Sequence, residues 1–121
     1  MTVISWNLQV KVVAGHLAEA KHLIQELVSD ARQEKGTLCY EWFLSADETT
    51  CHVNERYADC DAVMVHADRF DTQYAERFIA CFEPTSLSVY GDPDERVRRT
   101  LQELAPLYLG WFGGFERTTR P

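Results

Sequence analysis

Residues 2–12 alternate between apolar and polar side chains. Every second position is apolar, in the series Ile4, Trp6, Leu8, Val10 and Val12. A period of two predicts a β-strand with one face toward the core. After Gly15 the apolar residues recur every three or four positions as far as Ala31. That spacing predicts an amphipathic helix of about five turns, with Gly36 as its C-terminal stop.

Two further strands follow, TLCYEWFLSA and CHVNERYA, with the polar turn DETT between them. This arrangement predicts a β-hairpin. If Asp47 lies opposite Thr50, Glu41 faces Arg56 as a cross-strand pair of opposite charge. A loop one residue longer would reverse the two faces. The predicted register gives one face the side chains of Tyr40, Trp42, Leu44, Cys51, Val53, Glu55 and Tyr57.

The residues after the hairpin predict two helical stretches. Asp59 is a suitable N-cap for the first, whose apolar stripe is interrupted by one imidazole. That stripe consists of Ala62, Val63, His66 and Phe70. The second stretch carries Tyr74, Phe78, Cys81 and Phe82, and Pro84 is expected to end it.

A fourth strand, TSLSVYG, precedes the last predicted helix. The segment DPDE, residues 92–95, is typical of a helix start, with Asp92 as the cap and Pro93 in the first turn. The final segment, LYLGWFGGFERTTRP, is aromatic and glycine-rich, and we expect its apolar residues to be buried.

The order β-α-β-β-α-β predicts an α+β fold of the ferredoxin-like class. One domain of residues 1–121 is expected, with a core over about residues 2–92 and an extension of one helix and a tail over residues 93–121. Helices would cover one face of the sheet, yet both faces carry large apolar groups, such as Trp42 and Phe43. A second copy packed sheet against sheet is the simplest cover, so a homodimer is predicted.

Charge and composition exclude several partners. The net charge of −7 argues against binding to nucleic acid or to an anionic membrane surface. The N-terminus does not resemble a signal peptide, and no stretch is apolar enough to span a membrane, so a cytoplasmic protein is expected. The four cysteines lack zinc-site spacing and are expected to be reduced thiols, with no metal bound.

The hairpin and the helix after it resemble the antibiotic biosynthesis monooxygenase family, most closely its quinol monooxygenase branch. The matching pattern is a G-x-L-x-Y-E strand, an E-x-Y-x-D junction and a histidine nine residues after the tyrosine. Here these positions are Gly36, Leu38, Tyr40, Glu41, Glu55, Tyr57, Asp59 and His66. The resemblance spans roughly residues 3–92, and the extension matches only a subset of the family.

The resemblance implies a dimeric α+β barrel in which each subunit holds a pocket between sheet and helices. It also implies the oxidation of a small quinol or polycyclic phenol by O₂, without a metal, flavin or other cofactor. Such a reaction needs a base, hydrogen bonds that place the ring and a dry pocket.

His66 and Glu55 are the candidate catalytic residues. The imidazole suits proton transfer near neutral pH, and its helix stripe turns it toward the sheet. A core histidine bonded to a backbone carbonyl is the alternative. Glu55 could orient His66 or take a proton itself, or it could form a structural hydrogen bond or salt bridge.

Four further residues are candidates for substrate binding. Tyr57 could place a phenol or O₂ by its hydroxyl, and Trp42 and Tyr40 could stack on a ring, although all three could be ordinary aromatic core. Asn7, on the polar side of the first strand, could add an amide contact or could be a solvated or barrel-lining group.

Two other functions remain open. A ligand-binding or stress-response dimer of the same fold would keep the aromatic cluster but show no turnover. Haem binding ranks lower: Asn7 fits the haem-degrading branch, but Tyr57 occupies the place of its tryptophan, and His66 lies about a helical turn or more too early to be the expected ligand.

Overall fold

The computed structural model describes residues 2–117. The chain forms one mixed five-stranded sheet with the strand order β2-β3-β1-β4-β5. The elements are β1 (Ile4–Val12), α1 (Leu17–Ala31), β2 (Thr37–Leu44), β3 (Thr50–Tyr57), α2 (Cys60–Gln73), α3 (Ala75–Cys81), β4 (Phe82–Tyr90), α4 (Glu95–Leu101), a short 3₁₀ helix η1 (Gln102–Leu104) and β5 (Leu107–Leu109). The predicted α+β, ferredoxin-like class is confirmed.

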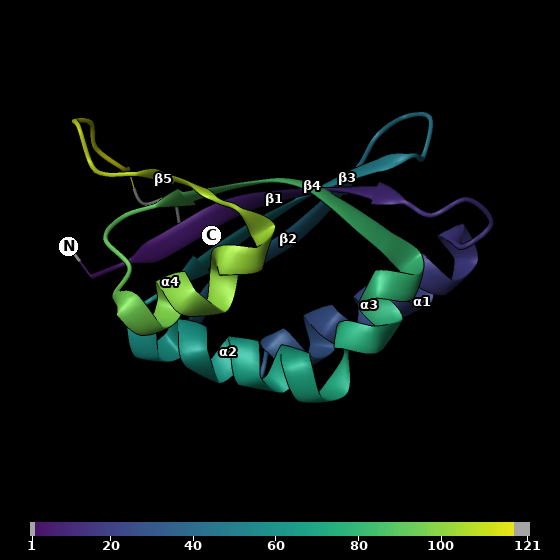
Figure 1. The fold of residues 1–121 in the computed structure, drawn as a ribbon, viewed down its shortest axis with the longest axis horizontal. Helices are drawn as coiled ribbons and strands as arrows, with labels where there is room; N and C mark the ends of the chain where they lie inside the picture. The colour runs from purple at the N-terminus through teal and green to yellow at the C-terminus, as the bar shows by residue number, and fades with distance from the viewer. Residues whose placement is uncertain (1, 118–121) are drawn as a thin grey trace.

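The four α-helices lie on one side of the sheet (Figure 1). We call this side of the sheet the closed face and the opposite side the open face. The alternation of β1 explains the core, because its apolar residues are buried on the closed face against the apolar side of α1. The contributing residues of α1 are Ala20, Leu23, Leu27 and Ala31.

The hairpin keeps its predicted faces but not its predicted register. Glu41 lies opposite Asn54, and Cys39 lies opposite Arg56, so the expected Glu41–Arg56 pair was wrong. The loop is longer than predicted: the backbone N–H of Ser45 donates to the carbonyl of Thr50 at 2.9 Å. Because the displacement is two residues, the parity of the strands is preserved.

Two predicted boundaries were also wrong. Asp94, rather than Asp92, caps α4, since its carboxylate accepts a hydrogen bond from the backbone N–H of Val97 at 3.1 Å. Strand β4 begins at Phe82 and contains Pro84, which pairs with Val10 where the β1–β4 register shifts. A proline is tolerated in a strand at such an irregularity.

The open face ends in a segment rich in exposed aromatic residues. Strand β5 runs parallel to β4, and the chain beyond it reaches Arg56 of β3, whose Nη1 donates to Glu116 Oε2 at 2.8 Å. The large apolar side chains left exposed here are Leu107, Leu109, Trp111, Phe112 and Phe115. Among the residues described, no helix has the length and apolar character needed to cross a membrane.

Candidate functional site

Five of the six predicted site residues converge on the closed face. Tyr40 and Trp42 come from β2, Glu55 and Tyr57 from the adjacent β3, and His66 from α2, which packs across both strands. The structure does not bring the sixth residue to them. Asn7 lies on the open face, where its Nδ2 donates to Oδ1 of Asn54 at 2.8 Å.

The start of α2 places His66 over the sheet. Asp59 caps the helix, its carboxylate accepting a hydrogen bond from the N–H of Ala62 at 2.8 Å. The backbone of Gly36 passes directly against this turn: a Cβ there would lie 2.5 Å from the Cβ of Ala62. Glycine therefore allows the close approach of α2 to the start of β2, one turn before His66.

Glu55 is the buried charge of the closed face, only 6% exposed. Its Oε1 accepts a short hydrogen bond from the hydroxyl of Tyr57 and lies 3.5 Å from Nε2 of His66. Burial raises the pKa of Glu55, although the positive charge of His66 and hydrogen bonds from Tyr57 and Trp6 oppose the rise. A carboxyl group with a raised pKa can exchange protons nearer to neutral pH than an exposed one.

A second carboxylate, which sequence reasoning missed, holds the other side of the imidazole. Glu34 Oε1 lies 2.9 Å from Nδ1 of His66 and accepts a hydrogen bond from Thr37 Oγ1 at 2.7 Å. Burial opposes ionisation of Glu34, but the hydrogen bonds from His66 and Thr37 hold its pKa below the ordinary value. The result is a chain of groups that runs from Glu34 through His66 and Glu55 to Tyr57.

The charges around His66 favour its protonated form. Burial disfavours the imidazolium, but the hydrogen bond to Glu34 and the negative charges of Glu55, Glu34 and Asp30 outweigh this effect and raise the pKa of His66. Nδ1 is hydrogen-bonded to Glu34, and Nε2 lies 3.5 Å from Glu55 as an ion-pair contact, so a carboxylate stands beside each N–H of the imidazolium.

Glu34 belongs to a row of acids along α1 and its extension. Glu26 binds Arg77 of α3 at 2.5 Å, and Asp30 binds Arg69 Nε of α2 at 2.7 Å. Glu34 binds His66 in the same way, one turn further on. The four-residue spacing of the three acids was the sequence signal that could have identified Glu34, although only Glu26 and Asp30 lie within α1 itself.

Aromatic rings surround the Glu55–His66 pair. The ring centroids of Tyr40 and Tyr57 lie 5.4 and 5.2 Å from that of His66, and Trp6 packs on Tyr57 at 4.9 Å. Trp42 packs on Phe82 at 5.1 Å. These side chains pack against one another between sheet and helices, where the resemblance led us to expect a pocket.

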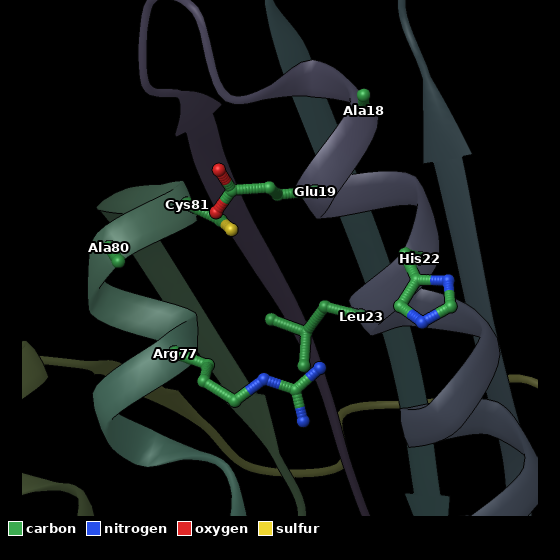
Figure 2. A pocket seen from close by; sticks show the side chains of 7 residues that line it. All are labelled: Ala18, Glu19, His22, Leu23, Arg77, Ala80 and Cys81. Carbon is green, nitrogen blue, oxygen red and sulfur yellow. The ribbon is translucent and has the colours of Figure 1, made fainter.

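Four hollows of the described chain lie away from this cluster. None of these four has His66, Glu55 or Tyr57 among its lining residues. One, of about 370 Å³, lies between α1 and α3 and is lined by His22, Arg77 and Cys81 among others (Figure 2). Burial raises the pKa of the Cys81 thiol, which disfavours a reactive thiolate there.

Within residues 2–117 no group of three or more His, Cys, Asp or Glu side chains is arranged to hold a metal ion. The geometry at His66 explains this locally. Glu34 and Glu55 approach opposite nitrogens of one ring, so the ring separates the two carboxylates.

Neither known protein families nor curated proteins match the sequence. Several solved structures, by contrast, are similar to this chain. MupZ from Pseudomonas fluorescens is 18% identical with a TM-score of 0.84, covering 97% of this chain and 96% of its own. SnoaB from Streptomyces nogalater, described as a cofactor-independent oxygenase, is 11% identical with a TM-score of 0.65, covering 78% of this chain and 96% of its own.

A protein of Nitrosomonas europaea provisionally assigned as an antibiotic biosynthesis monooxygenase is 16% identical, with a TM-score of 0.66 over 75% of this chain and 90% of its own. The chain has the fold of the antibiotic biosynthesis monooxygenases. At such low identity the likeness establishes the fold alone. The match to MupZ covers 97% of this chain and so includes most of the C-terminal extension, whereas the other two matches cover 78% and 75%.

Proposed function

We propose that this protein is a cofactor-independent monooxygenase that oxidises a small quinol or polycyclic phenol with O₂. One observation carries the proposal: a buried carboxylate, Glu55, contacts both an imidazole and a phenol hydroxyl beneath a wall of aromatic rings. The fold shared with SnoaB supports it.

The substrate is its own reductant in this reaction. A quinol and O₂ give a hydroxyquinone and water, so one oxygen atom enters the ring and the other leaves as water with two hydrogens of the substrate. The first step removes a phenolic proton, because the phenolate gives up an electron to O₂ more readily than the phenol does. The Glu55–His66 pair supplies the proton acceptor and a positive charge beside the phenolate.

The substrate ring would take a place among the rings of the closed face. Tyr57 is held as a neutral donor, because burial and the charge of Glu55 raise its pKa. Tyr40 packs on His66 from β2 and is not fully buried, so displacement of its side chain would open a route from solvent to the pair. Trp42 completes the wall, and its buried Nε1 has no hydrogen-bond partner among the described residues.

A binding protein without turnover is the second candidate. The close packing of Tyr40 and Tyr57 on His66 favours it, because a catalytic site needs room for substrate next to its reacting groups. In that case Glu34, His66 and Glu55 would form a structural network of charges.

Oxygen uptake with a panel of hydroquinones, in the presence of a metal chelator, tests the proposal. We expect turnover by the wild type and a loss of about 10²-fold or more in kcat for both His66→Ala and Glu55→Gln. His22→Ala is the matched control, because His22 is an exposed histidine of α1 that contacts neither Glu55 nor Tyr57 in the described structure. Equal rates in all four proteins would remove the pair from the reaction, and no uptake by the wild type would favour the binding protein.

A further inference from the structure

The packing of the fold does not by itself explain why a charged residue, Glu34, is largely buried at its position. Its side chain is 9% exposed, and it comes from the segment after α1, 32 residues away from its partner His66. Burying a carboxylate is costly unless it is paired and hydrogen-bonded. Both conditions are met by His66 Nδ1 at 2.9 Å and Thr37 Oγ1 at 2.7 Å.

We propose that Glu34 is a positioning residue that holds His66 by Nδ1, so that its Nε2–H points at Glu55. The inference rests on the proposed function and assigns the roles within it. Neutral imidazole has a single N–H and can donate to one carboxylate only, whereas the imidazolium donates to both. His66 is therefore the donor of the pair, and Glu55 is the base.

The proton movement follows from these roles. The substrate hydroxyl gives its proton to the Glu55 carboxylate, which becomes a neutral carboxylic acid. The electron pair of the O–H bond stays on the substrate oxygen as a phenolate. The imidazolium of His66 balances that negative charge, and Glu34 remains ionised throughout.

The other charged and titratable groups near His66 do not take over the role of Glu34. Asp30 is one turn earlier but is already bound by Arg69 and by the hydroxyl of Tyr74, which donates to it at 2.6 Å. Glu34 has His66 as its charged partner. The groups that act on the imidazole are Asp30 and Glu34 from α1 and its extension, Tyr40 from β2, and Glu55 and Tyr57 from β3. Arg69 and Tyr74, from α2 and its C-terminal end, bind Asp30.

The test is the isosteric change Glu34→Gln, read first by NMR titration of the His66 ring. We expect the pKa of His66 to fall by about one to three pH units, because the nearest negative charge is gone. The His66 signals are assigned by their loss in His66→Gln. The matched control is Glu26→Gln, which removes a carboxylate from the same row two turns earlier, where its partner is Arg77.

Turnover gives a second readout. Glu34→Gln should lower kcat by about 10- to 100-fold with little change in KM, and the pH dependence of kcat should shift with the His66 titration. Glu26→Gln should match the wild type in both readouts. A His66 pKa unchanged by Glu34→Gln, or a fall of equal size in Glu26→Gln, would overturn the assignment.

The titration decides the role of Glu34 even if the wild type shows no oxygen uptake, so failure of the proposed function and failure of this inference are distinguishable. If Glu34→Gln does not fold, Thr37→Val replaces it. That change removes only the hydroxyl that fixes Glu34, and it should lower the His66 pKa in the same direction by a smaller amount. An unchanged pKa in Thr37→Val would then count against the proposal.

Discussion

The closed and open faces of the sheet are built from the same strands but present opposite surfaces. Along β3, Val53, Glu55 and Tyr57 are buried under the helices, whereas Asn54 and Arg56 between them remain accessible. The closed face contains the network of Glu34, His66 and Glu55, largely buried and packed against aromatic rings. The open face combines polar side chains with an uncovered apolar segment, which indicates that only one of the two faces is complete in a single chain.

The largest expected effect is on assembly through the open face. We expect a homodimer that buries about 1,600 Å² or more in total. Trp111, Phe112 and Phe115 are exposed in the single chain, and each contributes roughly 1.5–3 kcal/mol when fully buried. Deleting residues 107–121 should therefore dissociate the dimer or lower its stability, as measured by light scattering and urea denaturation.

Changing the three aromatic residues together to serine is the matched control for this deletion, because it keeps β5 and the chain length. It should dissociate the dimer to the same extent. A wild type that scatters as a 13.9 kDa monomer at micromolar concentration would contradict the predicted dimer. A truncated protein as stable and as dimeric as its parent would contradict the role of the tail.

The second-largest expected effect is a difference in stability between substitutions at two neighbouring residues of β3, whose side chains point to opposite faces. Tyr57→Ala should lower the free energy of unfolding by about 3–5 kcal/mol, because it leaves a cavity in the core and removes the hydroxyl that binds Glu55. Arg56→Ala should cost about 1 kcal/mol or less, since its ion pair with Glu116 is exposed. Urea denaturation of both at one protein concentration measures the difference, and equal losses would show that the open face is as tightly packed as the closed face.

Side-chain alternation predicted the faces of this sheet correctly. The register of the hairpin was wrong by two residues, yet Glu55 and Tyr57 still lie beside Tyr40 and Trp42. Because side chains alternate with a period of two, shifting the strand pairing by two residues leaves every side chain on its predicted face. The length of the loop was not predictable in the same way, because it depends on turn geometry, such as the positive φ of Glu48. The same alternation places Asn7 on the open face, away from the site, because its neighbour Trp6 is buried on the closed face.

The contacts of His66 were harder to predict. Its helix stripe indicated the direction of the ring, and the N-cap Asp59 was identified correctly. Glu34 was missed because it lies beyond the periodic part of α1, where no apolar pattern gives its orientation. The close packing of aromatic rings around His66, where a pocket was expected, was also missed. Periodicity indicates which side chains face inward but not how closely they pack.

The smallest expected effect is a pH dependence of stability confined to the closed face. The pKa of His66 is raised above its ordinary value of 6.5 in the folded chain. A raised pKa means that the folded state binds the proton more tightly than the unfolded state does. The stabilisation is fully present below about pH 6.5 and is lost as the pH rises through the folded pKa.

His66→Gln cannot titrate, so the wild type should lose free energy of unfolding relative to this variant over that range. Urea denaturation of both proteins between pH 6 and 9 measures the difference. A wild type that gains stability over the variant as the pH rises would show that His66 is buried as a neutral ring, and the network of Glu34, His66 and Glu55 would then need a different distribution of protons.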